Sequence, residues 1–549
     1  MRIDFMPRIY LLSVSLLVVW LSGCNPPQRP SFDEISRPDP AKPQTLATEP
    51  DESAAKGIEG MALKSMNVPW ETWHSYYMAG KPIGYIHVQC GYDTEGNRDN
   101  VRTTVADKLT LRRGNAMFIQ SLVQNSIEDR SGTLISFDAD LRVGPVRSQF
   151  EGQASGEVLS TARIRGTDRQ TERAPWQPTA GGLAAIQQSL LAKPMVIGET
   201  RRFQLLLPIQ YRLGSVELVC RTRASISVLD GAVPNALEID VKTSMGDGPL
   251  IDSTIWIDEK GNLLKTYVPA LDLSAIRSTK ALAEATIDSA GAATPDLLSV
   301  LSVDVKGKLT TPAETFRSAF KIIPKPRVGK AEPPTVTFPP QINQWFRAKD
   351  DGSIQLLVSR DPNEPSRDGF TTLTSEPVDE DSKPNAIIDS NAGEVKKLAG
   401  LTRATEPRII ATDLARTVSQ LIGPGDFSRG FATASQTARD SVGDCTERAV
   451  LLAAMLRARE IPSRVVTGLV YTESGGSPKM QYHMWTLAWS GEAWISLDPT
   501  SGGLAPADRI ALASGNLADG DEYKFLSSIL DTIGSIDVEI INAKYQPVE

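Results

Sequence analysis

The chain is poor in cysteine and histidine, with four cysteines and three histidines among 549 residues. It also lacks an excess of positive charge, because 66 acidic residues outnumber 58 basic ones and give a net charge of -8. No run of lysine and arginine is interleaved with aromatic residues, so nucleic acid is excluded as the expected partner. The hydrophobic content of 41% suits a globular protein of several domains and excludes a fully disordered or fibrous chain.

Long apolar runs are scarce as well. The run at residues 9–21 follows Arg2 and Arg8 and is too short to span a bilayer comfortably as a helix. Positive residues before a short apolar run are typical of a signal peptide, which we place at residues 1–23. The signal implies an extracytoplasmic location in the cell envelope.

The signal peptide ends in Leu21-Ser22-Gly23-Cys24, which resembles the lipobox of bacterial lipoproteins. The resemblance implies that Cys24 is lipidated and anchors the mature chain to the inner or outer membrane. An ordinary secretory signal and an uncleaved membrane anchor are the alternatives. Residues 24–60 are rich in Pro, Ser, Ala and charge and almost free of aromatics, which predicts a disordered tether between anchor and body.

From about Trp70 to Phe320, within a domain that we place at residues 61–325, several stretches have hydrophobic residues at every second position, the period of a half-buried strand. The alternation is clearest at Ile135, Phe137, Ala139, Leu141 and Val143. The segment "TIWIDEKGNLLKTYV" predicts a hairpin, and "GGLAAIQQSLLAKPM" predicts a helix. We therefore expect a large antiparallel β-sheet domain, followed by a linker and ambiguous segment at residues 326–384.

Cys90 and Cys220 both fall on predicted strands of this domain. Because an extracytoplasmic compartment permits disulfides, they form a possible disulfide, and two buried free thiols are the alternative. His74 and His87 lie nearby without metal-ligand spacing to cysteines or carboxylates. We expect no metal and no cofactor, and we expect both histidines to be structural.

Helical spacing returns in the C-terminal part, which we place at residues 385–549, with Ile409, Leu414, Val418 and Leu421 on one expected face. A second helix begins in "SVGDCTERAVLLAAMLRAREIPSRVVTG". Asp444 followed three residues later by Glu447 predicts a capping box at its start. Cys445 then lies in the first turn, where unpaired N–H groups and the helix dipole favour a thiolate. An inert buried cysteine is the alternative.

A nucleophilic cysteine needs a base, and His483 is the only histidine after residue 87. The segment "YHMWTLAWSGEAWISLDPT" predicts a hairpin. If its loop were only Ser490-Gly491, His483 and Asp498 would face each other directly across the two strands. This arrangement suits a catalytic histidine and its orienting carboxylate, although each residue also has an ordinary structural interpretation.

Together, "GDCTERAVLLAAMLRAREIPSRVVTG", "YHMW" and "WISLDPT" resemble the transglutaminase-like superfamily of papain-like thiol enzymes. The resemblance covers roughly residues 385–515. It implies an α+β, papain-like domain in which Cys445 is the nucleophile, His483 the base and Asp498 the orienting acid. The sequence departs from the family pattern at Glu460, where glycine is usual, and in having no tryptophan between Phe346 and Met484 to help hold an oxyanion.

The whole chain is thus expected to be an α+β, multidomain protein with a membrane anchor and a thiol acyltransferase or peptidase at its C-terminal end. Its substrate would be a carboxamide or peptide carbonyl of a protein or peptide in the cell envelope. Two other functions are compatible with the sequence. One is a catalytically silent transglutaminase-like module that binds envelope proteins or peptides. The other makes the N-terminal sheet a lipid- or protein-binding domain, with the C-terminal part accessory.

Overall fold

The computed structural model describes residues 66–546 with gaps. The segments that it does not describe are 114–115, 144–145, 166–167, 209, 230, 246–247, 290–293, 296–299, 301, 327–332, 334–335, 337, 339–342, 362–375, 425–431, 474–476, 518–531 and 533. The predicted signal peptide at 1–23, the lipidation site Cys24 and the tether at 24–60 lie outside the described residues.

The N-terminal half is a large antiparallel sheet, as the alternating pattern predicts. It has 14 strands in the order β8-β7-β6-β5-β4-β3-β2-β1-β14-β13-β12-β11-β10-β9. The strands are β1 (Trp70–Met78), β2 (Lys81–Tyr92), β3 (Val101–Arg113), β4 (Ala116–Glu128), β5 (Leu134–Val143), β6 (Val146–Ser155), β7 (Val158–Arg165), β8 (Asp168–Pro175), β9 (Thr200–Leu206), β10 (Leu213–Val228), β11 (Gly231–Met245), β12 (Gly248–Ile257), β13 (Leu263–Val268) and β14 (Leu273–Ser278).

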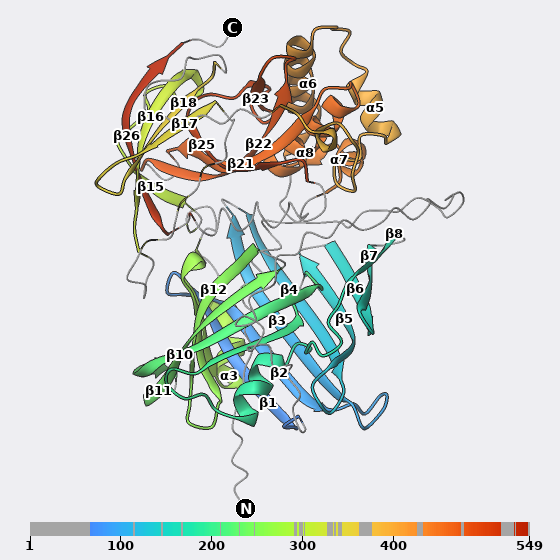
Figure 1. The fold of residues 1–549 in the computed structure, drawn as a ribbon, viewed down its shortest axis with the longest axis vertical. Coiled ribbons are helices and arrows are strands. Elements are labelled where there is room, and N and C mark those ends of the chain that lie inside the picture. Colours follow the sequence, from blue (N-terminus) through green and yellow to red (C-terminus); the bar gives the residue numbers. More distant parts are fainter. Residues whose placement is uncertain are drawn as a thin grey trace, which may run out of the picture.

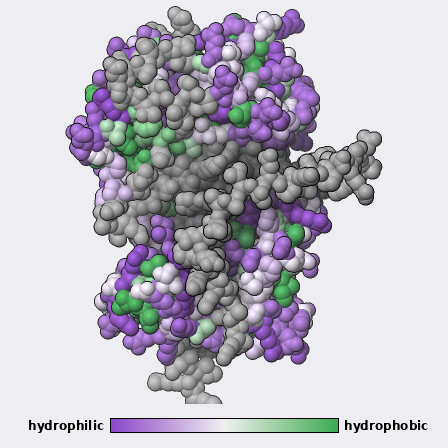
Figure 2. Space-filling view, in the orientation of Figure 1, coloured by the Kyte–Doolittle hydropathy of each residue, from purple (hydrophilic) through white to green (hydrophobic). Residues whose placement is uncertain are grey.

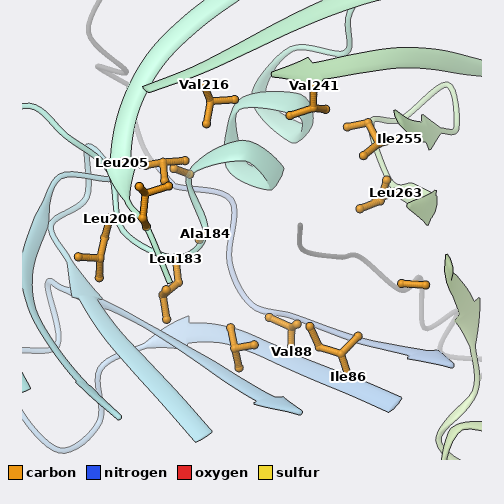
Figure 3. Close-up of a cluster of buried hydrophobic side chains, with 14 of the residues drawn as sticks. Ile86, Val88, Leu183, Ala184, Leu205, Leu206, Val216, Val241, Ile255 and Leu263 are labelled. Atoms are coloured by element: carbon orange, nitrogen blue, oxygen red, sulfur yellow. The ribbon is translucent and has the colours of Figure 1, made fainter. Parts of the chain in front are cut away.

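The sheet is strongly curved, and the predicted helix α2 (Ala185–Ala192) lies within its concave side (Figure 1; Figure 3). Figure 3 shows apolar side chains of β2, β10, β11, β12 and β13 turned toward the same interior. The buried Gln187 and Gln188 on α2 bond the backbone oxygens of Gly261 and Asn67 at 3.0 and 3.3 Å. Helix and sheet therefore share one hydrophobic core.

A helix that the alternating pattern does not predict, α3 (Lys280–Ser289), follows β14 and packs mainly on β2 and β1. Its Thr286 hydroxyl donates to the backbone oxygen of Gly84 at 2.8 Å. β14 is the last strand that the chain adds to the first sheet, and α3 follows it.

The predicted boundary at 325 differs from the structure, because β15 (Ser302–Lys306) and β16 (Thr315–Pro324) belong to the C-terminal sheet. So do β17 (Gln344–Ala348) and β18 (Ile354–Ser359), which lie inside the predicted linker. Alternation identifies a strand but not its partners, so the pattern could not assign these strands to a sheet.

The C-terminal half combines a 10-stranded sheet with helices packed beside it (Figure 1). Its remaining strands are β21 (Ser463–Thr472), β22 (Lys479–Trp489), β23 (Trp494–Asp498), β24 (Gly503–Leu504), β25 (Arg509–Gly515) and β26 (Ile536–Tyr545), and a separate parallel pair is formed by β19 (Gly423–Pro424) and β20 (Val442–Gly443). The α-helices are α5 (Gly393–Ala399), α6 (Pro407–Leu421), α7 (Ala434–Asp440) and α8 (Cys445–Arg457). The structure thus has the expected α+β, multidomain class.

Helix α8 is the centre of the C-terminal core. Every residue from Ala449 to Leu456 is fully buried, and the helix packs against β22, α6 and α7. A helix that is apolar on all sides has to be enclosed, so its first residue is held rigidly. After α8, Ile461 N–H bonds the Leu456 oxygen at 3.0 Å, and Glu460 takes φ 60°, a conformation that favours glycine.

The apolar face predicted for α6 is partly wrong. Leu414 and Val418 are buried, but Ile409 and Leu421 are 48% and 46% exposed. Ile410, Ala411 and Ala415 complete the buried face. The spacing of the apolar residues alone did not show which of them face the core and which face solvent.

Hydrophilic residues cover most of the described surface on the face in Figure 2, where hydrophobic patches are small and separate. None of the helices in the described part of the chain has the length and apolar character needed to cross a membrane.

Cys90 on β2 and Cys220 on β10 are both buried, and both are free thiols in the structure. The possible disulfide is therefore not formed, and the alternative of two buried free cysteines matches the structure. The two strands stand far apart in the order of the sheet, with five strands between them along the order given above.

Candidate active site

Cys445 is the first residue of α8, and the predicted capping box is confirmed. The Asp444 side chain accepts from the Thr446 N–H at 2.9 Å, and the Glu447 carboxylate accepts from the Asp444 N–H at 2.9 Å. These bonds fix the start of the helix without using the N–H of Cys445. Burial, followed by the charge of Asp444, raises the pKa of Glu447 well above its ordinary value.

Gly443 lies just before the start of α8, where there is no room for a side chain. A Cβ at Gly443 would come within 2.7 Å of the Glu447 Cβ and 3.3 Å of the Thr437 Cγ2. Arg448 clamps the same entry by donating to the Gly443 oxygen at 3.2 Å and to the Ile422 oxygen. Close packing therefore explains why Gly443, two residues before Cys445, has no side chain.

His483 on β22 and Asp498 at the end of β23 are in contact. The distance from His483 Nε2 to Asp498 Oδ2 is 2.9 Å. The predicted register, however, is wrong: Trp489 pairs with Trp494 and Thr486 with Leu497, because the turn spans four residues and closes with the Ser490 N–H bonded to the Ala493 oxygen. The two side chains therefore meet diagonally rather than directly opposite each other.

Asp498 is bonded through both carboxylate oxygens. The Thr500 N–H donates to Oδ1 at 2.8 Å, so the Asp-Pro-Thr segment forms a turn that orients the carboxylate. Arg509 Nη1 donates to Oδ2 at 2.9 Å, the same oxygen that faces His483. Asp498 and Arg509 are 4% and 5% exposed, so both charges are removed from water.

The charges of this cluster control its protonation. Burial alone would lower the pKa of His483, but the charge and hydrogen bond of Asp498, with a further hydrogen bond to Cys445, raise it to about 10. Burial alone would raise the pKa of Asp498, but the charges of His483 and Arg509 hold it far below its ordinary value. The site therefore favours an imidazolium between a carboxylate and the Cys445 thiol.

Trp485 forms the floor of the cluster. Its ring stacks beside His483 with centroids 6.3 Å apart, and the Arg509 guanidinium carbon lies 5.2 Å from its centroid. Gly468 on the intervening strand β21 pairs with His483, and a Cβ there would lie 2.7 Å from the Trp485 ring. This glycine leaves the space that the tryptophan fills.

Tyr482 precedes His483 and packs against the hydrophobic clusters of both halves of the chain. Burial, with the charge of Cys445 next in size, raises its pKa above the ordinary value. Tyr482 therefore contacts both halves of the chain, one residue before His483.

The structure brings together Cys445, His483 and Asp498, while Cys90 and Cys220 lie in the other half. Sequence reasoning missed Arg509 and its neighbour Asp508. Arg509 lies eleven residues after Asp498, with no motif that links the two, so only the fold reveals the pair. Within the described part of the chain, His, Cys, Asp and Glu form no group of three that could hold a metal ion.

Comparison with known sequences matches residues 400–499 to the transglutaminase-like superfamily. The match includes all three candidate catalytic residues and ends before Arg509. A comparison with curated proteins gave no match.

Three solved structures show similarity at low TM-scores. A β-barrel-like protein with a domain of unknown function from Brucella abortus has 8% identity, a TM-score of 0.29, and coverage of 39% of this chain and 96% of its own. A candidate cysteine protease from Cytophaga hutchinsonii has 15% identity, a TM-score of 0.24, and coverage of 42% and 90%. A candidate protease from Parabacteroides distasonis has 12% identity, a TM-score of 0.16, and coverage of 66% and 63%.

The matched residues lie in the α+β half of the chain, which contains the candidate site. Residues 400–499 form a transglutaminase-like domain.

Proposed function

We propose that the protein is a thiol acyltransferase of the transglutaminase-like type, with Cys445 as nucleophile, His483 as base and acid, and Asp498 as the orienting carboxylate. One observation carries this proposal: the only histidine after residue 87 bonds Asp498 at 2.9 Å and also contacts the cysteine at the mouth of a buried helix. Charge pairing of this kind activates a thiol, whereas burial alone makes it inert.

In the proposed reaction, the Cys445 thiolate attacks a carboxamide or peptide carbonyl carbon and forms a C–S bond. The C–N bond then breaks, and the imidazolium of His483 gives its proton to the departing amine. The acyl group remains on Cys445 as a thioester. An amine acceptor would produce a cross-link, and water would produce a carboxylic acid.

The helix start supports the charge that develops on the carbonyl oxygen. Because the capping box occupies the N–H groups of Thr446 and Asp444, the Cys445 N–H is available as an oxyanion donor. The positive end of the α8 dipole points to the same place.

The signal peptide and lipobox resemblance support an extracytoplasmic enzyme anchored through Cys24 to a cell-envelope membrane. Its substrates would then be envelope proteins or peptides, which the tether at 24–60 would let it reach. Incorporation of radiolabelled palmitate into the parent, but not into the Cys24→Ala variant, is the check on the anchor.

The test of the chemistry is the pH dependence of iodoacetamide alkylation, followed by peptide mass spectrometry on the folded protein. Cys90 and Cys220 serve as internal references, since both are buried and burial raises the pKa of Cys90 to about 12. We expect Cys445 to be labelled on the acidic side of neutrality, and His483→Ala to slow this labelling by on the order of ten-fold or more.

If Cys445 reacts as slowly as an ordinary thiol in both the parent and His483→Ala, the enzyme proposal fails and a silent binding module takes its place. Where labelling is fast, a glutamine peptide with hydroxylamine as acceptor tests acyl transfer, and Cys445→Ala is the blank.

A further inference from the structure

Arg509 bonds a member of the catalytic cluster, yet the proposed reaction does not use its charge. Its Nη1 donates to Asp498 Oδ2 at 2.9 Å, and its Nε donates to Asp508 Oδ1 at 3.1 Å and to the Pro506 oxygen at 3.0 Å. The guanidinium thus spans two carboxylates, which a lysine ammonium could not do with the same geometry.

The three charged groups are removed from water together. Asp498, Asp508 and Arg509 are 4%, 5% and 5% exposed. Burying charges is unfavourable unless each is well paired, so a structural role alone gives little reason for this arrangement. The orientation of a histidine, by contrast, depends on a carboxylate that stays ionised in a dry site.

Arg509 takes part in the contact between His483 and Asp498. His483 Nε2 and Arg509 Nη1 both lie 2.9 Å from the same oxygen of Asp498. They come from β22 and β25, the two strands that flank β21, and the Trp485 ring fills the space between them. Movement of Arg509 would therefore change where Asp498 points.

We propose that Arg509 is a positioning residue that keeps Asp498 ionised and aimed at His483, and that Asp508 holds Arg509 in place. The inference rests on the proposed function of the site. The charged groups that face this pair are His483 on the Asp498 side and Arg360 on the Asp508 side. Arg509 lies outside the family match at residues 400–499, so the assignment comes from this structure.

The experiment compares pH profiles of Cys445 alkylation in the full chain for the parent, Arg509→Met and Arg509→Lys. Without Arg509, Asp498 protonates more readily, so the acidic limb of the Arg509→Met profile should move up by about one pH unit. Misplacement of the carboxylate should slow labelling below neutrality by on the order of ten-fold. Arg509→Lys keeps the charge but not the fork, so its shift should be smaller.

A second variant, Asp508→Asn, should shift the alkylation profile of Cys445 in the opposite direction. Asp508→Asn keeps an oxygen that can accept from Arg509 Nε but removes a negative charge close to Asp498, so its acidic limb should move down. Arg457→Met is the matched control, because Arg457 is also buried and bonded to backbone oxygens at Lys383, Ser463 and Asn516 but lies at the far end of α8. It should lower the melting temperature without moving the profile.

The inference is overturned if both Arg509 variants reproduce the parent profile while His483→Ala remains slow. If the parent and His483→Ala profiles coincide, the proposed function itself has failed, whatever Arg509 does. A loss of folding in Arg509→Met leaves the decision to Arg509→Lys and Asp508→Asn, whose shifts differ in sign or size.

Discussion

His74 and Cys90 lie inside the N-terminal sheet, whereas His483 and Cys445 meet beside α8 in the C-terminal half. Burial, and secondarily the charge of Arg277, lower the pKa of His74 well below its ordinary value of 6.5. Burial raises the pKa of Cys90 to about 12, with Glu128 adding to the shift. Burial in a low dielectric therefore keeps both side chains neutral.

The C-terminal pair differs because a charge partner accompanies its burial. Asp498 raises the pKa of His483 to about 10 despite desolvation. Within the described part of the chain, His74 has no hydrogen bond at either ring nitrogen, whereas His483 bonds a carboxylate at 2.9 Å. The comparison teaches that reactivity follows the placement of charges around a buried group, rather than its residue type or depth.

Asp498→Asn should remove this difference and give the largest effect. Without the carboxylate charge, burial dominates, so the pKa of His483 should fall from about 10 to its ordinary value of 6.5 or below. Alkylation of Cys445 at neutral pH should slow by on the order of ten- to a hundred-fold. Selective histidine labelling and NMR titration can follow the imidazole, since the chain has only three histidines.

The same substitution has a signed effect on stability. A histidine whose pKa is raised on folding stabilises the folded state below its unfolded pKa, and this contribution is lost as the pH rises through the folded value. The melting temperatures of parent and Asp498→Asn should therefore converge between 6.5 and about 10. A constant difference across this range would contradict the charge pairing.

Gly443→Ala should sharpen the comparison by moving Cys445 without removing any charge. The added Cβ would lie 2.7 Å from the Glu447 Cβ, so the helix start has to shift. We expect a loss of about 1–3 kcal/mol in the free energy of unfolding and several-fold slower labelling of Cys445. Gly393→Ala in α5 is the control, since its Cβ would meet nothing within 4 Å.

Glu460→Gly should give the smallest effect and separate the scaffold from the chemistry. Glu460 has φ 60°, which glycine adopts without strain. Relief of strain, less the added freedom of the unfolded chain, should raise the free energy of unfolding by about 0.5–1 kcal/mol. Denaturant titration measures this gain, and the alkylation profile of Cys445 should stay unchanged because Glu460 lies beyond the opposite end of α8.

The sequence predicted the start of α8 well, because a capping box depends only on residues three apart. It also predicted the hairpin that holds His483 and Asp498, since alternation and turn residues are local signals. The register was wrong because the Ser490 side chain and backbone both bond Ala493 and close a longer turn. A two-residue turn and a four-residue turn cannot be told apart from the sequence when both contain Ser-Gly.

By itself, the sequence determined the nature of the two halves, the entry to α8 and the identity of Cys445, His483 and Asp498 as candidates, because these follow from period, capping and residue type. The tertiary structure alone decided which sheet receives β15 to β18, that Cys90 and Cys220 stay apart, and that Arg509 joins Asp498. These outcomes depend on contacts between distant segments, where strand partners and buried charges are chosen by the packing of the whole fold.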